Sequence, residues 1–283
     1  MQFVFHVDIT IETVETKIKM KKYIYIILII FGFSSCSEYQ KAIKSEDLTV
    51  KFDQASKQYE KGKYYKALTL FEQMAPSFRG QPEAEKMFYM FSQSYYKTKQ
   101  YYLSGYQFES FAAGYPKSDK IEEASFLGAK SYSMLSPVYS LDQTDTEKAI
   151  EKLQSFIDAF PNSTYLAEAN VVVKVLREKM EKKAYENAFE YNKIADFKSA
   201  IVALENFIID YPGTPYKEKA LYYKLDSAYQ LAINSVPAKM EERLNAAKTA
   251  YNNLIKFNSN TEFKQKADNM LAIINTDLKQ FSK

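Results

Sequence analysis

Apolar residues recur at helical spacing along most of the chain. In residues 84–97, five of them follow steps of three and four and so share one helix face: Ala84, Met87, Phe88, Phe91 and Tyr95. In residues 47–62, the predicted face is marked by Val50, Phe52, Ala55 and Tyr59. No run shows the strict alternation that is typical of a strand. The pattern therefore predicts an all-α protein.

One motif occurs three times, at residues 108–118, 153–163 and 204–214. Its form is apolar-x-x-Phe-x-x-x-aromatic-Pro-x-Ser/Thr. Because proline cannot continue a helix, each helix is predicted to stop at the aromatic residue before it. The hydroxyl residue that closes each motif (Ser118, Ser163, Thr214) is then placed to N-cap the next helix, and Pro215 suits a first helical position.

A small residue precedes each motif by four positions, and two related units open and close the series. The five small residues are Ala67, Ser104, Ala149, Ala200 and Ala247. Their spacings of 37 to 51 residues exceed the period of about 34 residues in an ideal tetratricopeptide repeat. We expect an α-solenoid of about five elaborated, tetratricopeptide-like helix pairs at 47–260, followed by a C-terminal capping helix at 261–283.

Two of the elaborations are visible in the sequence. Residues 136–148 form a loop in which Asp142 and Asp145 suggest a cation site, but residues 144–147 match a capping box, and that interpretation is favoured. Residues 165–195 contain neither Gly nor Pro, which predicts one long helix or two nearly continuous ones.

The beginning of the chain has the pattern of a lipoprotein signal peptide. Residues 20–22 supply positive charge, residues 23–33 are apolar, and small residues lead to Cys36, the one cysteine in the sequence. The apolar run is shorter than the roughly 20 residues of a membrane-spanning helix. We expect a misannotated upstream segment at 1–19, translation from Met20, a signal peptide at 20–35 and a lipidated tether at 36–46.

Composition excludes several kinds of chemistry. The single histidine is His6, so a chain cut before Cys36 has no histidine and no second cysteine. Zinc sites and His- or Cys-based catalysis are therefore not expected, and we predict neither a metal, nor a cofactor, nor an enzyme. The net charge is +3, from 38 basic and 35 acidic residues, without a basic block that would bind nucleic acid.

Together, Cys36, the repeats and their uneven spacing resemble the BamD/ComL family. The most telling segments are residues 59–74, 94–111 and 156–163. The resemblance implies a lipoprotein of the Gram-negative outer membrane that faces the periplasm. It also implies two kinds of partner: the periplasmic domains of the Omp85-type barrel protein BamA, and unfolded outer-membrane β-barrel proteins.

The repeat register adds candidate peptide-binding residues. Phe52 and Tyr59 precede Ala67 by the same offsets at which Tyr89 and Tyr96 precede Ser104. First helices of tetratricopeptide pairs line the concave face, so these aromatics are expected to form a ladder for a substrate peptide that ends in an aromatic residue. The alternative, which the abundance of Tyr favours, is that they belong to the core between helices.

Other functions remain open at the level of sequence. One is a different periplasmic tetratricopeptide lipoprotein, serving peptidoglycan or division machinery. Another is a substrate-capturing lipoprotein of a nutrient-uptake complex, although a glycan site is expected to use Trp and the chain has none. For Cys36 itself, the expected role is acylation, because a chain cut before it has no second cysteine and no histidine that would give it another role. More than one acyl chain is expected, because one chain alone binds a membrane only marginally.

Overall fold

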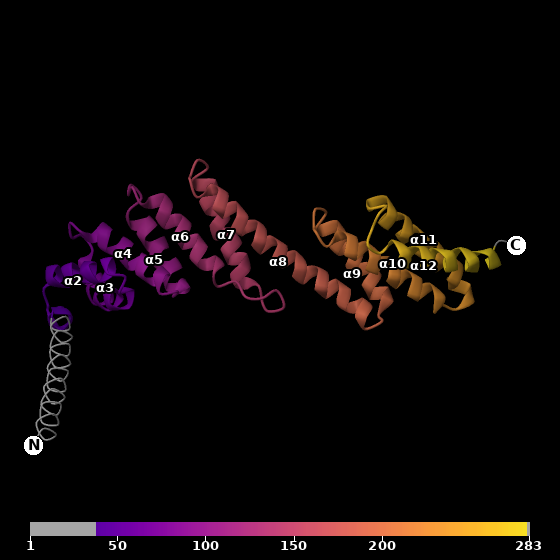
Figure 1. The fold of residues 1–283 in the computed structure, drawn as a ribbon, viewed down its shortest axis with the longest axis horizontal. Coiled ribbons are helices and arrows are strands. Elements are labelled where there is room, and N and C mark those ends of the chain that lie inside the picture. Colours follow the sequence, from indigo (N-terminus) through magenta and orange to yellow (C-terminus); the bar gives the residue numbers. More distant parts are fainter. Residues whose placement is uncertain (1–37, 282–283) are drawn as a thin grey trace, which may run out of the picture. The chain divides into compact units, whose positions relative to one another are not determined.

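The computed structural model describes residues 38–281, and in this part every regular element is a helix (Figure 1). The described residues divide into two compact units, residues 38–131 and 132–281. In each unit, helices that follow one another in the sequence pack together. The prediction of an all-α chain of tetratricopeptide-like helix pairs is confirmed.

The first unit begins with a short helix at residues 38–44. It continues with α2 (Leu48–Glu60), α3 (Tyr64–Phe78), α4 (Ala84–Lys97), α5 (Tyr101–Gly114) and most of α6 (Ile121–Ser133). α2 packs against α3, α3 against α4, and α4 against α5. α6 approaches α5 closely at Gly128, where an added Cβ would lie 3.1 Å from the Phe108 Cβ.

The second unit contains α7 (Thr144–Ala159), α8 (Leu166–Lys193), α9 (Phe197–Asp210), α10 (Lys217–Ile233), α11 (Pro237–Phe257), α12 (Lys264–Leu278) and η1 (Lys279–Phe281). α8 has 28 residues, so of the two predicted alternatives the single long helix is confirmed. It packs against α7 and also against α9 and α10 (Figure 1). One helix thus serves two successive parts of the repeat array.

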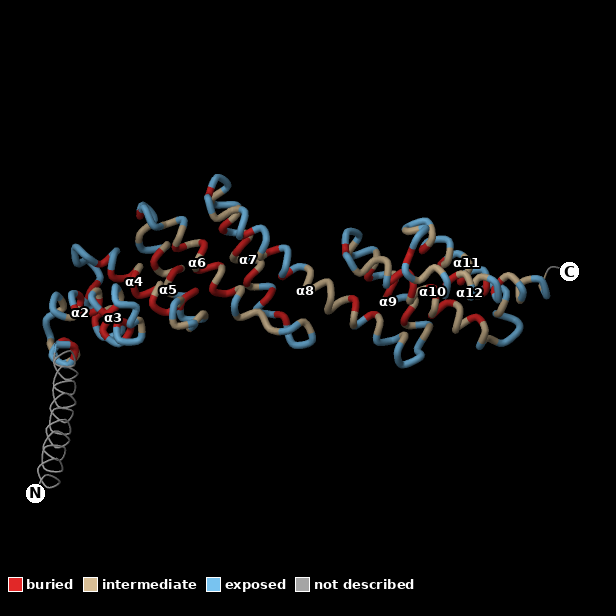
Figure 2. The backbone as a smooth tube through the Cα atoms, in the orientation of Figure 1, coloured by how far each residue is buried: buried red, intermediate tan, exposed pale blue. Residues whose placement is uncertain are grey.

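The repeat positions are buried as predicted. The five small residues Ala67, Ser104, Ala149, Ala200 and Ala247 are each 0% exposed, and the apolar stripe of every motif lies in the buried layer (Figure 2). α5, α7 and α9 end immediately before the aromatic residue of the motif, which is the C-cap in each case. The small residues allow neighbouring helices to approach, and the prolines set where the helices stop.

The hydroxyl residues of the motif hydrogen-bond within the turn that precedes the next helix, and not within the helix itself. Ser163 Oγ accepts a hydrogen bond from the Tyr165 N–H (3.2 Å), and α8 begins only at Leu166. Thr214 and Ser118 behave in the same way. The N-cap prediction for these residues is wrong, as is the placement of Pro215 inside a helix, because the hydroxyls stabilise the turn that leads into the helix.

Two further predictions need correction. Val50 is 44% exposed, because it lies two residues before Phe52 and so about 200° around the helix from it. The capping box at 144–147 is not formed: Gln143 is the N-cap, and Asp142 Oδ1 accepts the hydrogen bond of the Thr144 N–H (3.0 Å).

Candidate functional site

The predicted ladder residues lie on α2 and α4, the first helices of the first two pairs. Phe52 is buried (7% exposed) and its ring centre is 5.4 Å from that of Phe78 at the end of α3. The Lys86 ammonium lies 5.8 Å from the centre of the Phe52 ring. Phe52 therefore packs between helices and presents little surface to a ligand.

Tyr59 and Tyr96 occupy equivalent places and make equivalent contacts. Each packs edge-on against the tyrosine that opens the next helix, with ring centres 5.5 Å apart for Tyr59–Tyr64 and 5.8 Å apart for Tyr96–Tyr101. Both are partly buried against the core of the first unit. These pairs brace the turn between the two helices of a pair, and such edge-to-face contacts contribute about 0.5–1.5 kcal/mol each.

A polar network connects the first helices through Gln93. The Tyr59 hydroxyl donates to Gln93 Oε1 (3.0 Å), and Gln93 Nε2 donates to the Tyr89 hydroxyl (2.6 Å). Gln93 Nε2 also approaches Glu123 Oε1 on α6 (3.4 Å). The Tyr89 ring packs against Phe111, with 5.6 Å between ring centres. Three first helices are thereby joined by side chains from α2, α4 and α6.

The electrostatics of this network keep its tyrosines neutral. Burial raises the pKa of Tyr89, and the neighbouring Glu123 carboxylate raises it further. Burial also raises the pKa of Tyr59. Lys120 lies 3.3 Å from Glu123 and over the Tyr89 ring. The network offers hydroxyl and amide groups for recognition but no activated nucleophile.

A second feature of the first unit, not predicted from sequence, is a pocket of about 250 Å³ beside Arg79. Phe88, Phe111 and Tyr115 form its aromatic walls, and Gly80 leaves one side open. The Arg79 guanidinium lies 5.5 Å from the centre of the Phe88 ring. Arg79 forms no ion pair with any residue that the structure describes, so its charge is available to a ligand.

The exposed aromatics of this unit also differ from the predicted set. Tyr65 on α3 is 67% exposed, and Tyr106 on α5 is 59% exposed. Both lie on second helices, outside the buried stripe that the periodicity identifies. Sequence reasoning missed them because it compared aromatics on first helices only. Tyr65 has a counterpart in register, since it precedes Ala67 by two residues as Tyr102 (63% exposed) precedes Ser104.

The family comparison completes the description. The model of the YfiO family, described as outer membrane lipoprotein, matches residues 44–244 and 180–281. The chain belongs to the YfiO family of outer membrane lipoproteins. This is the BamD-like family that the sequence resembles, and its members are non-enzymatic scaffold lipoproteins. No curated protein matches the chain.

Two observations bear on anchoring and cofactors. Between residues 38 and 281, no helix combines the length and the apolar character that crossing a bilayer requires. The same residues contain no cluster of three or more potential metal ligands. Cys36 lies outside the described residues, and its acylation stays a prediction.

Proposed function

We propose that this YfiO-family protein is a lipid-anchored scaffold of the outer-membrane β-barrel assembly complex, facing the periplasm. In this role it binds the periplasmic domains of the Omp85-type subunit BamA and receives unfolded barrel proteins. The observation that carries the proposal is the family match, which extends over most of the helical part of the chain. The helical pairs supply binding surfaces, which is what a scaffold requires.

The start of the described chain fits an anchor at Cys36. Tyr39 is 9% exposed and Ala42 is 1% exposed, so the short helix at residues 38–44 belongs to the core of the first unit. Only Ser37 separates Cys36 from that helix. At about 3.5 Å per residue, acyl chains on Cys36 would hold the start of this short helix within roughly 10 Å of the membrane surface.

The Arg79 pocket supports substrate capture. An aromatic side chain fits between Phe88, Phe111 and Tyr115, while a terminal carboxylate beside it pairs with Arg79. A barrel protein that ends in an aromatic residue carries both groups. Burial raises the pKa of Tyr115, so its phenol stays neutral and does not repel the carboxylate.

Affinity purification from solubilised membranes tests the scaffold function. We expect an Omp85-type barrel to co-isolate with the wild-type chain, and Cys36→Ser to leave the membrane fraction while the domain stays folded. Consistent absence of such a barrel, in a preparation with intact helical circular dichroism, contradicts the proposal and favours another envelope scaffold.

Substrate capture has a separate test with peptides. A peptide that ends in Phe with a free carboxylate is compared with the same peptide as its amide, using fluorescence anisotropy. Arg79→Gln is expected to weaken only the free-acid peptide, by about three- to tenfold, whereas Lys86→Gln on the adjacent helix serves as the matched control. Equal binding of both peptides to the wild-type protein would overturn the assignment of this pocket.

A further inference from the structure

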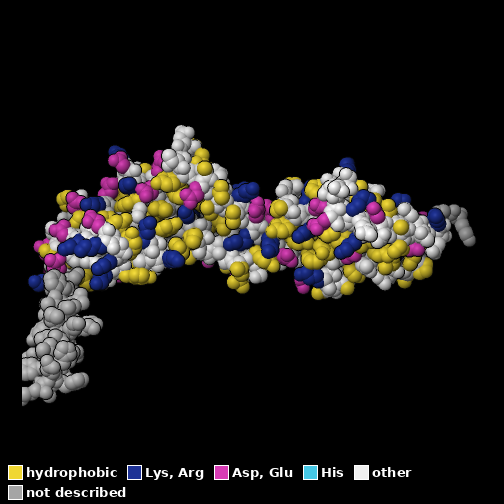
Figure 3. Space-filling model, viewed as in Figure 1, with side chains coloured by type: hydrophobic (Ala, Val, Ile, Leu, Met, Phe, Trp, Pro, Cys, Tyr) yellow, Lys and Arg dark blue, Asp and Glu magenta, His cyan; other side chains and the backbone are white. Residues whose placement is uncertain are grey.

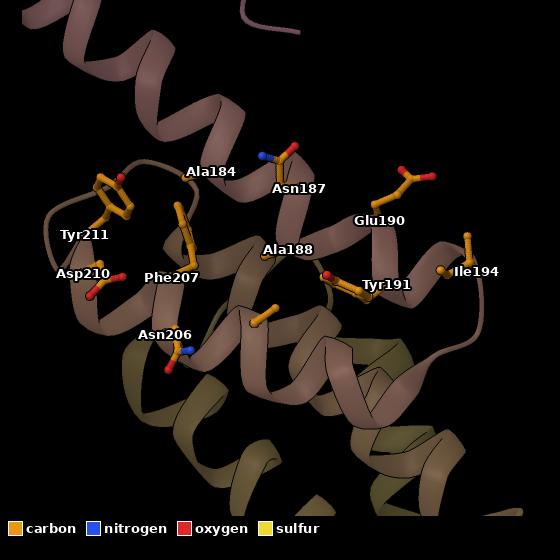
Figure 4. A pocket seen from close by; sticks show the side chains of 11 residues that line it. Ala184, Asn187, Ala188, Glu190, Tyr191, Ile194, Asn206, Phe207, Asp210 and Tyr211 are labelled. Carbon is orange, nitrogen blue, oxygen red and sulfur yellow. The ribbon is translucent and has the colours of Figure 1, made fainter. Parts of the chain in front are cut away.

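A groove in the second unit lies between the end of α8 and α9 (Figure 4). Its volume is about 670 Å³. The floor consists of Ala188, Ala203 and Phe207, of which Ala188 and Phe207 are buried. In the close view, Asn187 and Glu190 rise from α8 on one side, and Asn206 and Asp210 belong to α9 on the other.

The groove is open because α8 is too long for α7 to cover. Contacts from the α7 side reach α8 at Arg177, which donates to Gln154 (3.4 Å), and at Lys179 and Lys183, which donate to the loop before α7. The groove residues of α8 begin at Ala184, just beyond this region. α9 and α10 hold the other side of the same turns, where Asn192 donates to Asp226 (2.8 Å).

The polar groups of the groove are acidic or neutral, and most of them are free to bind a partner. None of the lining residues is Lys or Arg. Glu190 is paired with Lys193 at 2.9 Å, outside the lining. Within the described residues, Asp210 forms no ion pair, and the side-chain amides of Asn187 and Asn206 form no hydrogen bond. The groove therefore carries net negative charge and unused hydrogen-bonding capacity.

The shape and the residues of the groove are suited to a helix. Alanines on the floor allow a close approach, as the small residues of the repeats do elsewhere in the chain. The lining turns of α8, residues 184–194, extend for about 16 Å, which matches about three turns of a bound helix. Tyr191 (42% exposed) and Ile194 (63% exposed) add apolar area at one end.

We propose that this groove binds an amphipathic α-helix of a partner protein, with an aliphatic ridge flanked by Lys or Arg. The ridge lies on Ala188, Ala203 and Phe207, and a flanking cation pairs with Asp210, whereas Glu190 is already paired with Lys193. This is the helix-in-groove mode of recognition, in which the apolar face supplies affinity and the charges supply orientation. The proposal does not depend on which barrel subunit the protein binds.

Two matched peptides test the proposal on the full chain. One is a stapled helix of about 18 residues with a Leu/Ala ridge flanked by Arg, and the other carries Glu in place of each Arg. Binding is measured by fluorescence anisotropy at low and high salt. We expect the basic helix to bind more tightly, and salt to reduce that difference because the charges are exposed.

Variants locate the binding to the groove. Asp210→Asn should weaken the basic helix about two- to fivefold, and Asn206→Arg should weaken it further by placing a cation on the rim. Both positions are exposed, so folding is preserved, and Glu242→Gln on α11 is the control of equal charge change. Equal binding of the two helices, or binding unchanged by Asn206→Arg, overturns the proposal. Self-association of the wild-type chain that Asn206→Arg abolishes also overturns it, since the occupant is then a second copy.

Discussion

The turn that joins the helices of a pair offers a sharp test of the local physics. It occurs between α2 and α3, between α4 and α5, and between α8 and α9, each time with one residue at positive φ: Gly62 (68°), Lys99 (61°) and Ala195 (61°). In the turn between α8 and α9, the Asp196 N–H donates to the Tyr191 carbonyl (2.9 Å) and the Ala195 N–H donates to the Asn192 carbonyl (3.0 Å). This is a Schellman motif, in which glycine is the usual residue. Only the first turn has it.

Replacement of Ala195 by Gly should therefore stabilise the protein. A non-glycine residue in the left-handed region is disfavoured by about 1–2 kcal/mol, while the extra freedom of glycine in the unfolded chain offsets about 0.4–1 kcal/mol of this. The net gain is about 0.5–1 kcal/mol. Gly62→Ala should lower the free energy of unfolding by at least as much. No atom lies within 4 Å of the added Cβ, so this loss comes from the backbone conformation alone.

Urea unfolding followed by circular dichroism measures the change in stability for both replacements, and hydrogen exchange at α8 and α9 localises the effect of Ala195→Gly. Ala246→Gly is the matched control, because the same replacement at an exposed position inside α11 should destabilise by about 1 kcal/mol. The reasoning is refuted if Ala195→Gly lowers stability as Ala246→Gly does, because the sign must follow the backbone angle.

Three further outcomes follow from the packing and the caps. Gly128→Ala should lose about 1–3 kcal/mol to overpacking, since its Cβ would lie 3.1 Å from the Phe108 Cβ, and this loss offsets the gain of about 1 kcal/mol in helix propensity; Gly114→Ala, with nothing within 4 Å, should keep that gain, so thermal unfolding distinguishes the two. Asp196 caps α9, and hydrogen bonds from the Ser199 hydroxyl and the Ser199 N–H lower the pKa of its carboxyl group; this contribution to stability is present above pH 3.8 and is lost as the pH falls through the lowered pKa, so Asp196→Ala should lower the urea midpoint more at pH 7 than in strong acid. Lys179→Met should expose residues 136–141 to hydrogen exchange, because the Lys179 ammonium donates to Ser136 Oγ (2.6 Å) and to the Pro137 carbonyl (2.9 Å).

The helices and their repeats could be predicted because they depend on local chemistry. Steps of three and four place Met87 and Phe91 in the core, and in the repeat motif the proline after Tyr115 or Tyr211 coincides with the end of a helix. The failures lie at the ends of helices. A hydroxyl such as Ser163 can cap a helix or a preceding turn, and the sequence pattern is the same in both cases.

The candidate site was harder to predict because it depends on distances between repeats. Tyr59 and Tyr96 occupy equivalent positions in successive repeats, as their register indicates, but their rings pack against the tyrosine that opens the next helix and so stabilise a turn. The link between Tyr59 and Tyr89 is Gln93, a residue that no periodicity distinguishes. Arg79 escapes notice in the sequence for a similar reason, since its importance comes from Phe88 and Tyr115, which are near it only after folding.

The uneven repeat spacing has a physical consequence that joins these observations. In a regular array, each helix pair covers the next, and the only open surfaces are the two long faces. Here the interval of 51 residues between Ala149 and Ala200 is occupied by the 28-residue α8, whose first part packs on α7 and whose last turns pack on α9. The extra turns of α8 place the groove beyond the part of α8 that α7 and its preceding loop contact. Shortening α8 by two turns, with removal of residues 177–183, should therefore bring α7 towards α9 and abolish binding of the basic helix, whereas lengthening the 134–143 loop by the same number of residues should leave the groove and its binding intact.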